Sequence, residues 1–145
     1  MENDKLKNDK ILRLLPHRYP FMLLDQITDL EPGKRISGLK NVTYNEWYFQ
    51  GLPAKLMVVP ASVLSEAIAQ LGGMLVLQEE EQDQQRLIFF SGLDQVRFRK
   101  PVRPGDTLTL SAEIVRRRGR VGRLRMEGKV QDKIVFEGLM QFAVE

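Results

Sequence analysis

One long, mostly apolar stretch dominates the middle of the chain, from about Ser62 to Glu80. Its apolar side chains fall on nearly every side of a helical projection: Val63, Leu64, Ala67, Ile68, Leu71, Met74, Leu75 and Leu77. A helix that is apolar nearly all round is normally central and buried. The pattern therefore predicts one core helix over 62–80, in which Glu66 is the only charged residue before the C-terminal end.

Three segments near the C-terminus alternate between apolar and polar residues, over about 107–114, 123–130 and 134–144. A period of two marks strands with one buried face. An earlier strand includes 97–99 and is followed by a turn rich in Pro and Gly at 101–106. One apolar helix against one antiparallel sheet is a two-layer α+β domain. We therefore expect a single domain over residues 1–145, with the sheet wrapped around the long central helix.

The first sixty residues predict a short helix, a hairpin and a loop. Residues 3–14 are amphipathic, and Pro16 should end that helix. Segments 21–30 and 35–43 are expected strands, because the Pro-Gly pair between them suits a tight turn. Residues 45–59 are rich in aromatics and interrupted by Pro53, which predicts a loop, and the polar run 79–86 predicts another.

Composition narrows the class of protein further. The 145 residues are 43% hydrophobic and 28% charged, which is ordinary for a globular protein. Apolar stretches stop short of the ~20 residues that cross a bilayer, and the N-terminus has no signal-like apolar region. We expect no membrane span and a cytoplasmic location. The absence of cysteine removes disulfides and thiolate sites, and a single histidine, His17, excludes zinc sites with several His ligands.

A basic run over 116–123 raises the question of nucleic-acid binding. The run falls across an expected turn between strands, where solvated charges are normal, and no aromatic residues are interleaved with it. The net charge of +3 is mild. Nucleic acid is therefore the least favoured partner, and a basic surface that attracts an acidic protein is the better interpretation.

Short motifs occur in a fixed order over nearly the whole chain. They are Leu15–Phe21 followed by Leu24-Asp25, Glu31–Lys34, Lys40–Thr43, Phe49–Gly51, Glu66–Gln70, Gly92–Asp94, and Arg97–Val102 with Pro104–Asp106. Together they resemble the FabZ-type beta-hydroxyacyl-acyl carrier protein dehydratases, a branch of the hot-dog fold.

The resemblance implies a homodimer or a ring of dimers, with two sheets joined edge to edge and an acyl-thioester tunnel at the interface. It implies a catalytic His from one subunit, a Glu from the other, and no metal or redox cofactor. The substrate would be an acyl chain on the phosphopantetheine of acyl carrier protein or coenzyme A, as in fatty acid biosynthesis or polyketide and specialised lipid synthesis.

The chain departs from the family's pattern at one place. The family's run after Phe-x-Gly is His-Phe-Pro-Gly-x-Pro-Val-Met-Pro-Gly, and residues 52–61 occupy it here without gaps. Leu52 stands at the His position and Ala61 at the Gly, whereas Pro60 and the helical Glu66 are kept. The resemblance assigns catalysis to Glu66, and it assigns substrate binding to Phe49, Gly51, Leu52, Pro60, Ala61 and Phe98.

Leu52 cannot transfer a proton, and loss of a general acid–base group typically costs about 10²–10⁴ in rate. The sequence therefore predicts a protein that binds acyl thioesters but is impaired in dehydration. It would act alone or as one half of a mixed dimer with a His-bearing paralogue. One alternative is a thioesterase that uses Glu66. Another is a residual dehydratase that uses Glu66, water or His17.

Other residues have both structural and functional interpretations. Glu66 fits the positive end of a helix dipole as well as a catalytic role, and His17 is better explained by a structural role in a turn. A structure with His17 beside Glu66, over the ligand, would contradict a silent enzyme. The aromatic run 47–49 suits a tunnel wall or the core. Gly72 and Gly73, unfavourable inside a helix, predict close packing against a strand or a ligand.

Overall fold

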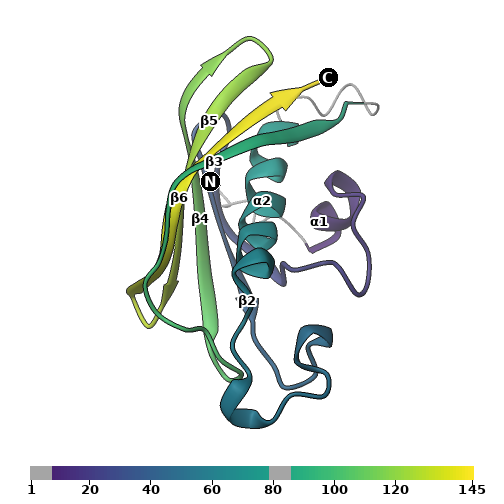
Figure 1. Cartoon of the computed structure of the whole chain (residues 1–145). Helices are drawn as coiled ribbons and strands as arrows, with labels where there is room; N and C mark the ends of the chain where they lie inside the picture. Colours follow the sequence, from purple (N-terminus) through teal and green to yellow (C-terminus); the bar gives the residue numbers. More distant parts are fainter. Residues whose placement is uncertain (1–7, 79–85) are drawn as a thin grey trace.

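The computed structural model describes residues 8–78 and 86–145, and it shows a curved antiparallel sheet wrapped around one long helix (Figure 1). The elements are α1 (Asn8–Leu14), β1 (Gln26–Glu31), β2 (Arg35–Asn41), the 3-10 turns η1 (Trp47–Phe49) and η2 (Ala54–Leu56), α2 (Ala61–Gln78), β3 (Ile88–Phe98), β4 (Thr107–Arg118), β5 (Val121–Val130) and β6 (Lys133–Val144). The strand order is β1-β2-β4-β5-β6-β3, with every neighbouring pair antiparallel. The predicted α+β architecture is confirmed.

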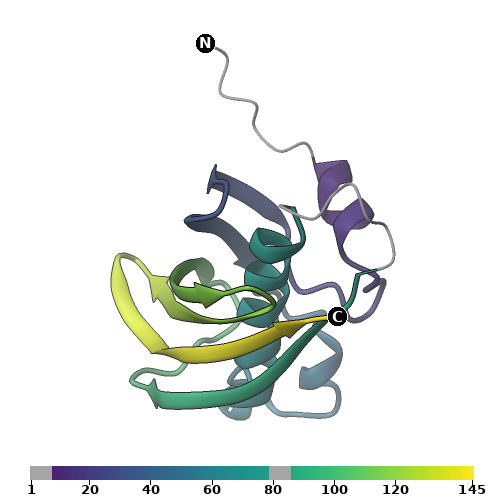
Figure 2. The same cartoon turned by 90° about the horizontal axis from the view of Figure 1, so that it is seen from above.

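Helix α2 fills the concave side of the sheet, and α1 lies on the side of α2 that the sheet leaves uncovered (Figure 2). Twelve of its 18 residues are buried, as expected for a helix that is apolar nearly all round. The helix is long and apolar enough to span a membrane, with a mean hydropathy of 1.2, but 67% of it is buried inside the fold. This is the pattern of a core helix, since the sheet already covers the surface that lipid would contact.

The predicted hairpin exists, but its first strand is shorter than expected. Residues 21–25 lie outside β1, because their backbone bonds to other partners. The backbone N–H of Leu23 donates to the side-chain Oε1 of Gln70 on α2 (2.9 Å), and that of Phe21 donates to the carbonyl of Arg18 (2.7 Å). Leu23 is therefore attached to the helix, whereas Asp25 already bonds to β2, its N–H donating to the carbonyl of Leu39 (2.9 Å).

The remaining boundaries differ in smaller ways. The expected strand at 97–99 is the end of the longer strand β3, and the expected loop 45–59 contains two 3-10 turns. The basic run crosses the β4–β5 turn as predicted. Parts of the expected first helix (3–7) and of the expected polar loop (79–85) lie outside the described residues.

The two helical glycines have different neighbours. A Cβ on Gly72 would lie 2.6 Å from Cδ1 of Leu124 on β5, so this glycine allows the helix to approach the sheet. A Cβ on Gly73 would lie 3.7–4.0 Å from Ile88, Leu15 and Phe90, which is ordinary contact. Close packing against a strand thus accounts for Gly72 but leaves Gly73 with room for a methyl group.

Substituting these glycines by alanine is therefore expected to have opposite effects on stability. Gly73→Ala should raise the free energy of unfolding by about 1 kcal/mol, because alanine is the better helix former. In Gly72→Ala the fully buried Leu124 must move, and overpacking of about 1–3 kcal/mol offsets or exceeds that gain. Chemical denaturation of both variants measures the difference. Equal stabilisation by both would contradict the packing described for Gly72.

Candidate functional site

Glu66 lies in the second turn of α2 and meets a histidine from the segment that precedes β1. Nε2 of His17 is 3.3 Å from Oε1 of Glu66, and both side chains are 30% exposed. The sequence alone does not place these residues together, because no local pattern links the turn after α1 to the core helix. The contact makes His17 part of the site rather than only a turn residue.

Gln70 holds the two segments together. Its Nε2 donates to Oε1 of Glu66 (3.1 Å) and to the carbonyl of Phe21 (2.8 Å), and its Oε1 accepts the N–H of Leu23. The side chain is only 2% exposed, and a buried amide is stable when its polar atoms are paired in this way. Residues i and i+4 share a helix face, so the spacing of Glu66 and Gln70 was the sequence signal for this bond.

The imidazole of His17 has one nitrogen, Nε2, through which it can exchange a proton with the site. Its Nδ1 is buried and makes no hydrogen bond within the described part of the chain. The contact with Glu66 fits the tautomer that carries the proton on Nε2, which then donates to the carboxylate. Any proton leaving the ring toward the site must therefore pass through Nε2, so His17 and Glu66 form one unit.

A cavity of about 440 Å³ opens beside this unit, between α1, α2 and the start of β3. Its wall is mostly apolar and includes Leu15, Ala69, Ile88 and Phe90. The polar lining consists of His17, Glu66 and Gln70 together with Arg13, Arg18 and Arg86. An apolar cleft of this size with a few convergent polar groups is the usual form of a small-molecule site. The arrangement suits a ligand with a hydrocarbon part and a reactive polar end.

The other predicted site residues lie elsewhere in the single chain. Leu52 is 39% exposed and follows Gly51, whose φ of +76° favours glycine. Pro60 and Ala61 are exposed at the start of α2. The ring of Phe98 is exposed and stacks on Phe136, with centroids 6.0 Å apart, while Phe49 is buried in the core. None of the six predicted substrate-binding residues lines the cavity at Glu66.

Aromatic rings connect the η1 turn to the site. The ring centroids lie 5.9 Å apart for His17 and Phe21, and 6.5 Å apart for Phe21 and Trp47. Trp47, Tyr48 and the buried Phe49 then contact one another edge to face. The aromatic residues 47–49 are thus partly at the surface and partly in the core. A shift of the η1 turn would move Trp47, whose ring faces Phe21, the ring next to His17.

Apolar side chains also gather at one edge of the sheet. Strand β3 ends the strand order, and it exposes Phe89, Leu93 and Phe98, each between 45% and 51% exposed. An unpaired strand edge with apolar side chains is a template for pairing with another strand. Among residues 8–78 and 86–145, no three His, Asp or Glu side chains are grouped as metal ligands would be.

A single helix enclosed by a curved antiparallel sheet defines the hot-dog fold, and solved structures share it. The dehydratase heterocomplex ApeI:P from Xenorhabdus doucetiae aligns with a TM-score of 0.73, covering 92% of this chain and 89% of that chain at 18% identity. A hypothetical thioesterase protein with coenzyme A from Streptococcus pneumoniae aligns with a TM-score of 0.64, covering 83% and 84% at 13% identity. Similarity at these identities establishes the fold.

Sequence comparison identifies the family within that fold. The model of the FabA-like domain matches residues 15–138. The 3-hydroxyacyl-[acyl-carrier-protein] dehydratase FabZ of Bacillus subtilis is 45% identical over 139 residues, covering 96% of this chain and 98% of the relative. FabZ of Macrococcus caseolyticus is also 45% identical, covering 96% and 95%. The chain belongs to the FabZ-type dehydratase family, which confirms the resemblance inferred from its motifs.

Proposed function

We propose that this protein binds acyl thioesters of acyl carrier protein or coenzyme A in the cytoplasm, and that it dehydrates 3-hydroxyacyl chains slowly. The observation that carries the proposal is the mostly apolar cavity whose polar lining includes Glu66, His17 and Gln70, together with Arg13, Arg18 and Arg86. A hydrocarbon chain fits the apolar wall, and the carboxylate can act on atoms next to a thioester carbonyl. Fatty acid synthesis is the pathway in which we expect such a ligand.

The low rate follows from the residue at position 52. Dehydration removes a proton from the alpha carbon and protonates the departing beta-hydroxyl, so it needs two proton-transfer groups. Leu52, at the position where the resemblance expects the His, provides neither an acid nor a base. The remaining carboxylate of Glu66 has to serve both steps, or share them with water or with His17.

We propose that the active assembly contains two subunits joined through β3. The exposed apolar residues of that edge support this arrangement, because a second strand would bury them. Within one chain, Leu52 does not line the cavity at Glu66, which suits a site completed by a second subunit. The partner is a second copy of this chain or a His-bearing paralogue. The heterocomplex from Xenorhabdus doucetiae is a precedent for mixed assembly among hot-dog dehydratases.

A second candidate is residual dehydration by His17 and Glu66 together. The 3.3 Å contact favours it, since an imidazole that shares a proton with a carboxylate can replace part of the missing pair. The buried Nδ1 of His17 limits this route, because the ring has no second nitrogen with which to relay the proton to solvent. We therefore expect slow turnover rather than the full rate from this pair.

Thioester hydrolysis is a third candidate. The contacts of Glu66 with Gln70 and with His17 both use Oε1, so neither of them occupies Oε2. A carboxylate oxygen beside an acyl cavity can activate water for attack on the thioester carbonyl. This route needs no histidine at position 52.

Direct assay of the purified protein separates these functions. We expect the protein to bind an acyl-pantetheine thioester and to hydrate a trans-2-enoyl thioester slowly. The loss of enoyl absorbance measures the hydration rate. Release of free thiol from acyl-coenzyme A would identify a thioesterase instead. Hydration at the rate of a FabZ enzyme measured in parallel would refute the proposed impairment, and failure to bind any acyl-pantetheine would refute the proposed ligand class.

A further inference from the structure

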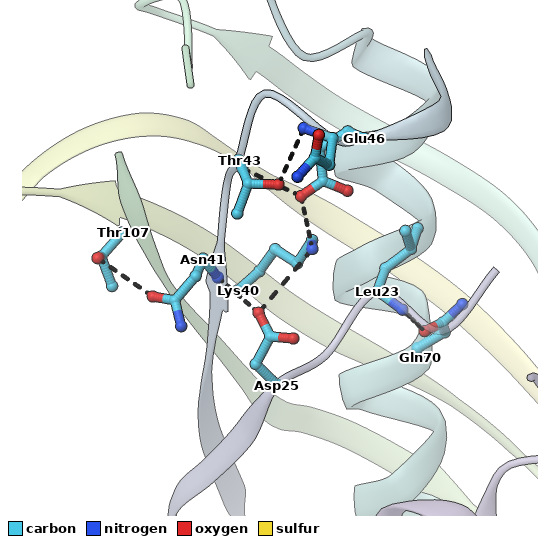
Figure 3. Close-up of polar contacts among 9 residues, drawn as sticks. Leu23, Asp25, Lys40, Asn41, Thr43, Glu46, Gln70 and Thr107 are labelled. Carbon is cyan, nitrogen blue, oxygen red and sulfur yellow. Dashed lines mark hydrogen bonds and ion pairs between the residues drawn. The ribbon is translucent and has the colours of Figure 1, made fainter. Parts of the chain in front are cut away.

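A lysine with little access to solvent lies at the end of β2. The side chain of Lys40 is 12% exposed, and its Nζ lies 2.9 Å from Oε1 of Glu46, which is itself 11% exposed (Figure 3). A second carboxylate, Oδ2 of Asp25, lies 3.9 Å away on the other side. Lysine is almost never buried unless it is paired. The cluster of Lys40, Asp25 and Glu46 therefore meets the condition under which such a lysine is stable.

Each carboxylate of this cluster also holds a backbone amide. Oδ2 of Asp25 accepts the N–H of Asn41 (2.6 Å), and Oε1 of Glu46 accepts the N–H of Thr43 (3.1 Å). Asp25 belongs to the chain that leads into β1, whereas Asn41 ends β2 and Glu46 belongs to the loop that follows. Lys40 thus joins the base of the hairpin to the loop that leaves it (Figure 3).

The next residues carry the aromatic side chains near the site. Glu46 immediately precedes the η1 turn, and the N–H of Phe49 donates back to the carbonyl of Glu46 (3.0 Å). Trp47 in that turn faces Phe21, which faces His17. Leu52 follows three residues after Phe49, and its N–H donates to the Phe49 carbonyl (3.0 Å). The position of Glu46 in the cluster therefore affects the position of the Trp47 ring and of residue 52.

Tyr48 shows the electrostatic effect of the same cluster. Burial raises the pKa of Tyr48, and the negative charges of Glu46 and Asp25 raise it further. The phenol therefore keeps its proton to a higher pH than an ordinary tyrosine does. Without the positive charge of Lys40, two carboxylates would stand beside a buried phenol and one another, and the loop would be expected to move until water reached them.

We infer that Lys40 is a positioning residue, which fixes the η1 turn and position 52 by bridging Asp25 to Glu46. The consequence for ligand affinity rests on the proposed function, whereas the consequence for the turn does not. Misplacement of a site by about 1 Å can cost 10²-fold in rate even when the change is remote from the chemistry. Lys40 lies on the path from the hairpin to the loop, so its loss should displace the loop without disturbing the helix and sheet.

The single tryptophan of the chain makes this inference measurable. Trp47 follows Glu46 directly and is 45% exposed as a residue, so its fluorescence reports the turn. In Lys40→Met we expect the Trp47 emission to shift toward the wavelength of indole in water, with the far-UV circular dichroism unchanged. We expect affinity for an acyl-pantetheine thioester to fall by about tenfold or more. Lys40→Arg should retain both properties, because a guanidinium can bridge the same carboxylates.

Two further variants complete the test. Lys34→Met removes the exposed pair with Glu31 in the β1–β2 turn, and it should leave the Trp47 emission and the affinity unchanged. Glu46→Gln breaks the same bridge from the other side, and it should reproduce the Trp47 shift if Lys40→Met does not fold. An unchanged Trp47 spectrum in folded Lys40→Met or Glu46→Gln would overturn the inference. If the wild-type protein bound no thioester, the proposed ligand class would fail while the spectrum still decided the role of Lys40.

Discussion

Leu52→His is expected to raise the rate of trans-2-enoyl thioester hydration by about 10²–10⁴, the usual contribution of a positioned general acid–base group. The backbone at this position is already ordered, since the N–H of Leu52 donates to the Phe49 carbonyl and Gly51 adopts its left-handed conformation. Imidazole is the side chain whose unperturbed pKa lies closest to neutrality, so it can both accept and return a proton. The measurement is enoyl hydration at equal protein concentration, for the variant and the wild-type protein.

The control for this gain is Leu52→Gln, which places a polar side chain of similar reach at the same position without a group that titrates near neutrality. It should leave the rate near that of the wild-type protein. A second arm, Leu52→His with Ala61→Gly, restores both positions at which the chain departs from the family's run. No rate increase in either His-bearing variant, with the fold and thioester binding retained, would show that position 52 does not limit dehydration.

Glu66→Gln is expected to remove whatever acyl-thioester chemistry the protein performs, again by about 10²–10⁴. The substitution keeps the size of the side chain, and its amide oxygen can still accept the hydrogen bond from Gln70. What it removes is the only carboxylate among the described residues that line the acyl cavity. Hydration and thiol release are measured on the same preparation, and ligand affinity is expected to change by only a few fold.

Two other variants show whether the loss is specific to Glu66 and whether His17 takes part in the reaction. Glu113→Gln breaks an exposed pair with Arg125 on the sheet, and it should change neither activity. His17→Gln retains a donor toward Glu66 but removes the imidazole. A loss as large as that of Glu66→Gln would assign the chemistry to the His17–Glu66 unit. A small loss would assign it to the carboxylate alone, as in hydrolysis. Full activity in Glu66→Gln would exclude Glu66 as a catalytic residue.

Local patterns determined most of the architecture. The apolar stretch over 62–80 gave a core helix because side-chain periodicity depends on neighbouring residues, and the same holds for the alternating strands at the C-terminal end. The family followed from short motifs in a fixed order, which sequence comparison bears out. The leucine at position 52 is also a fact of the sequence alone.

Contacts between distant segments were decided by the tertiary structure. His17 meets Glu66, and Gln70 binds the backbone of residues 21 and 23, only because the sheet leaves one side of α2 open to that segment. Lys40 is enclosed only because Asp25 and Glu46 converge on it from two sides. Periodicity shows which face of an element is buried, but the partner that covers a polar side chain depends on how the whole chain packs.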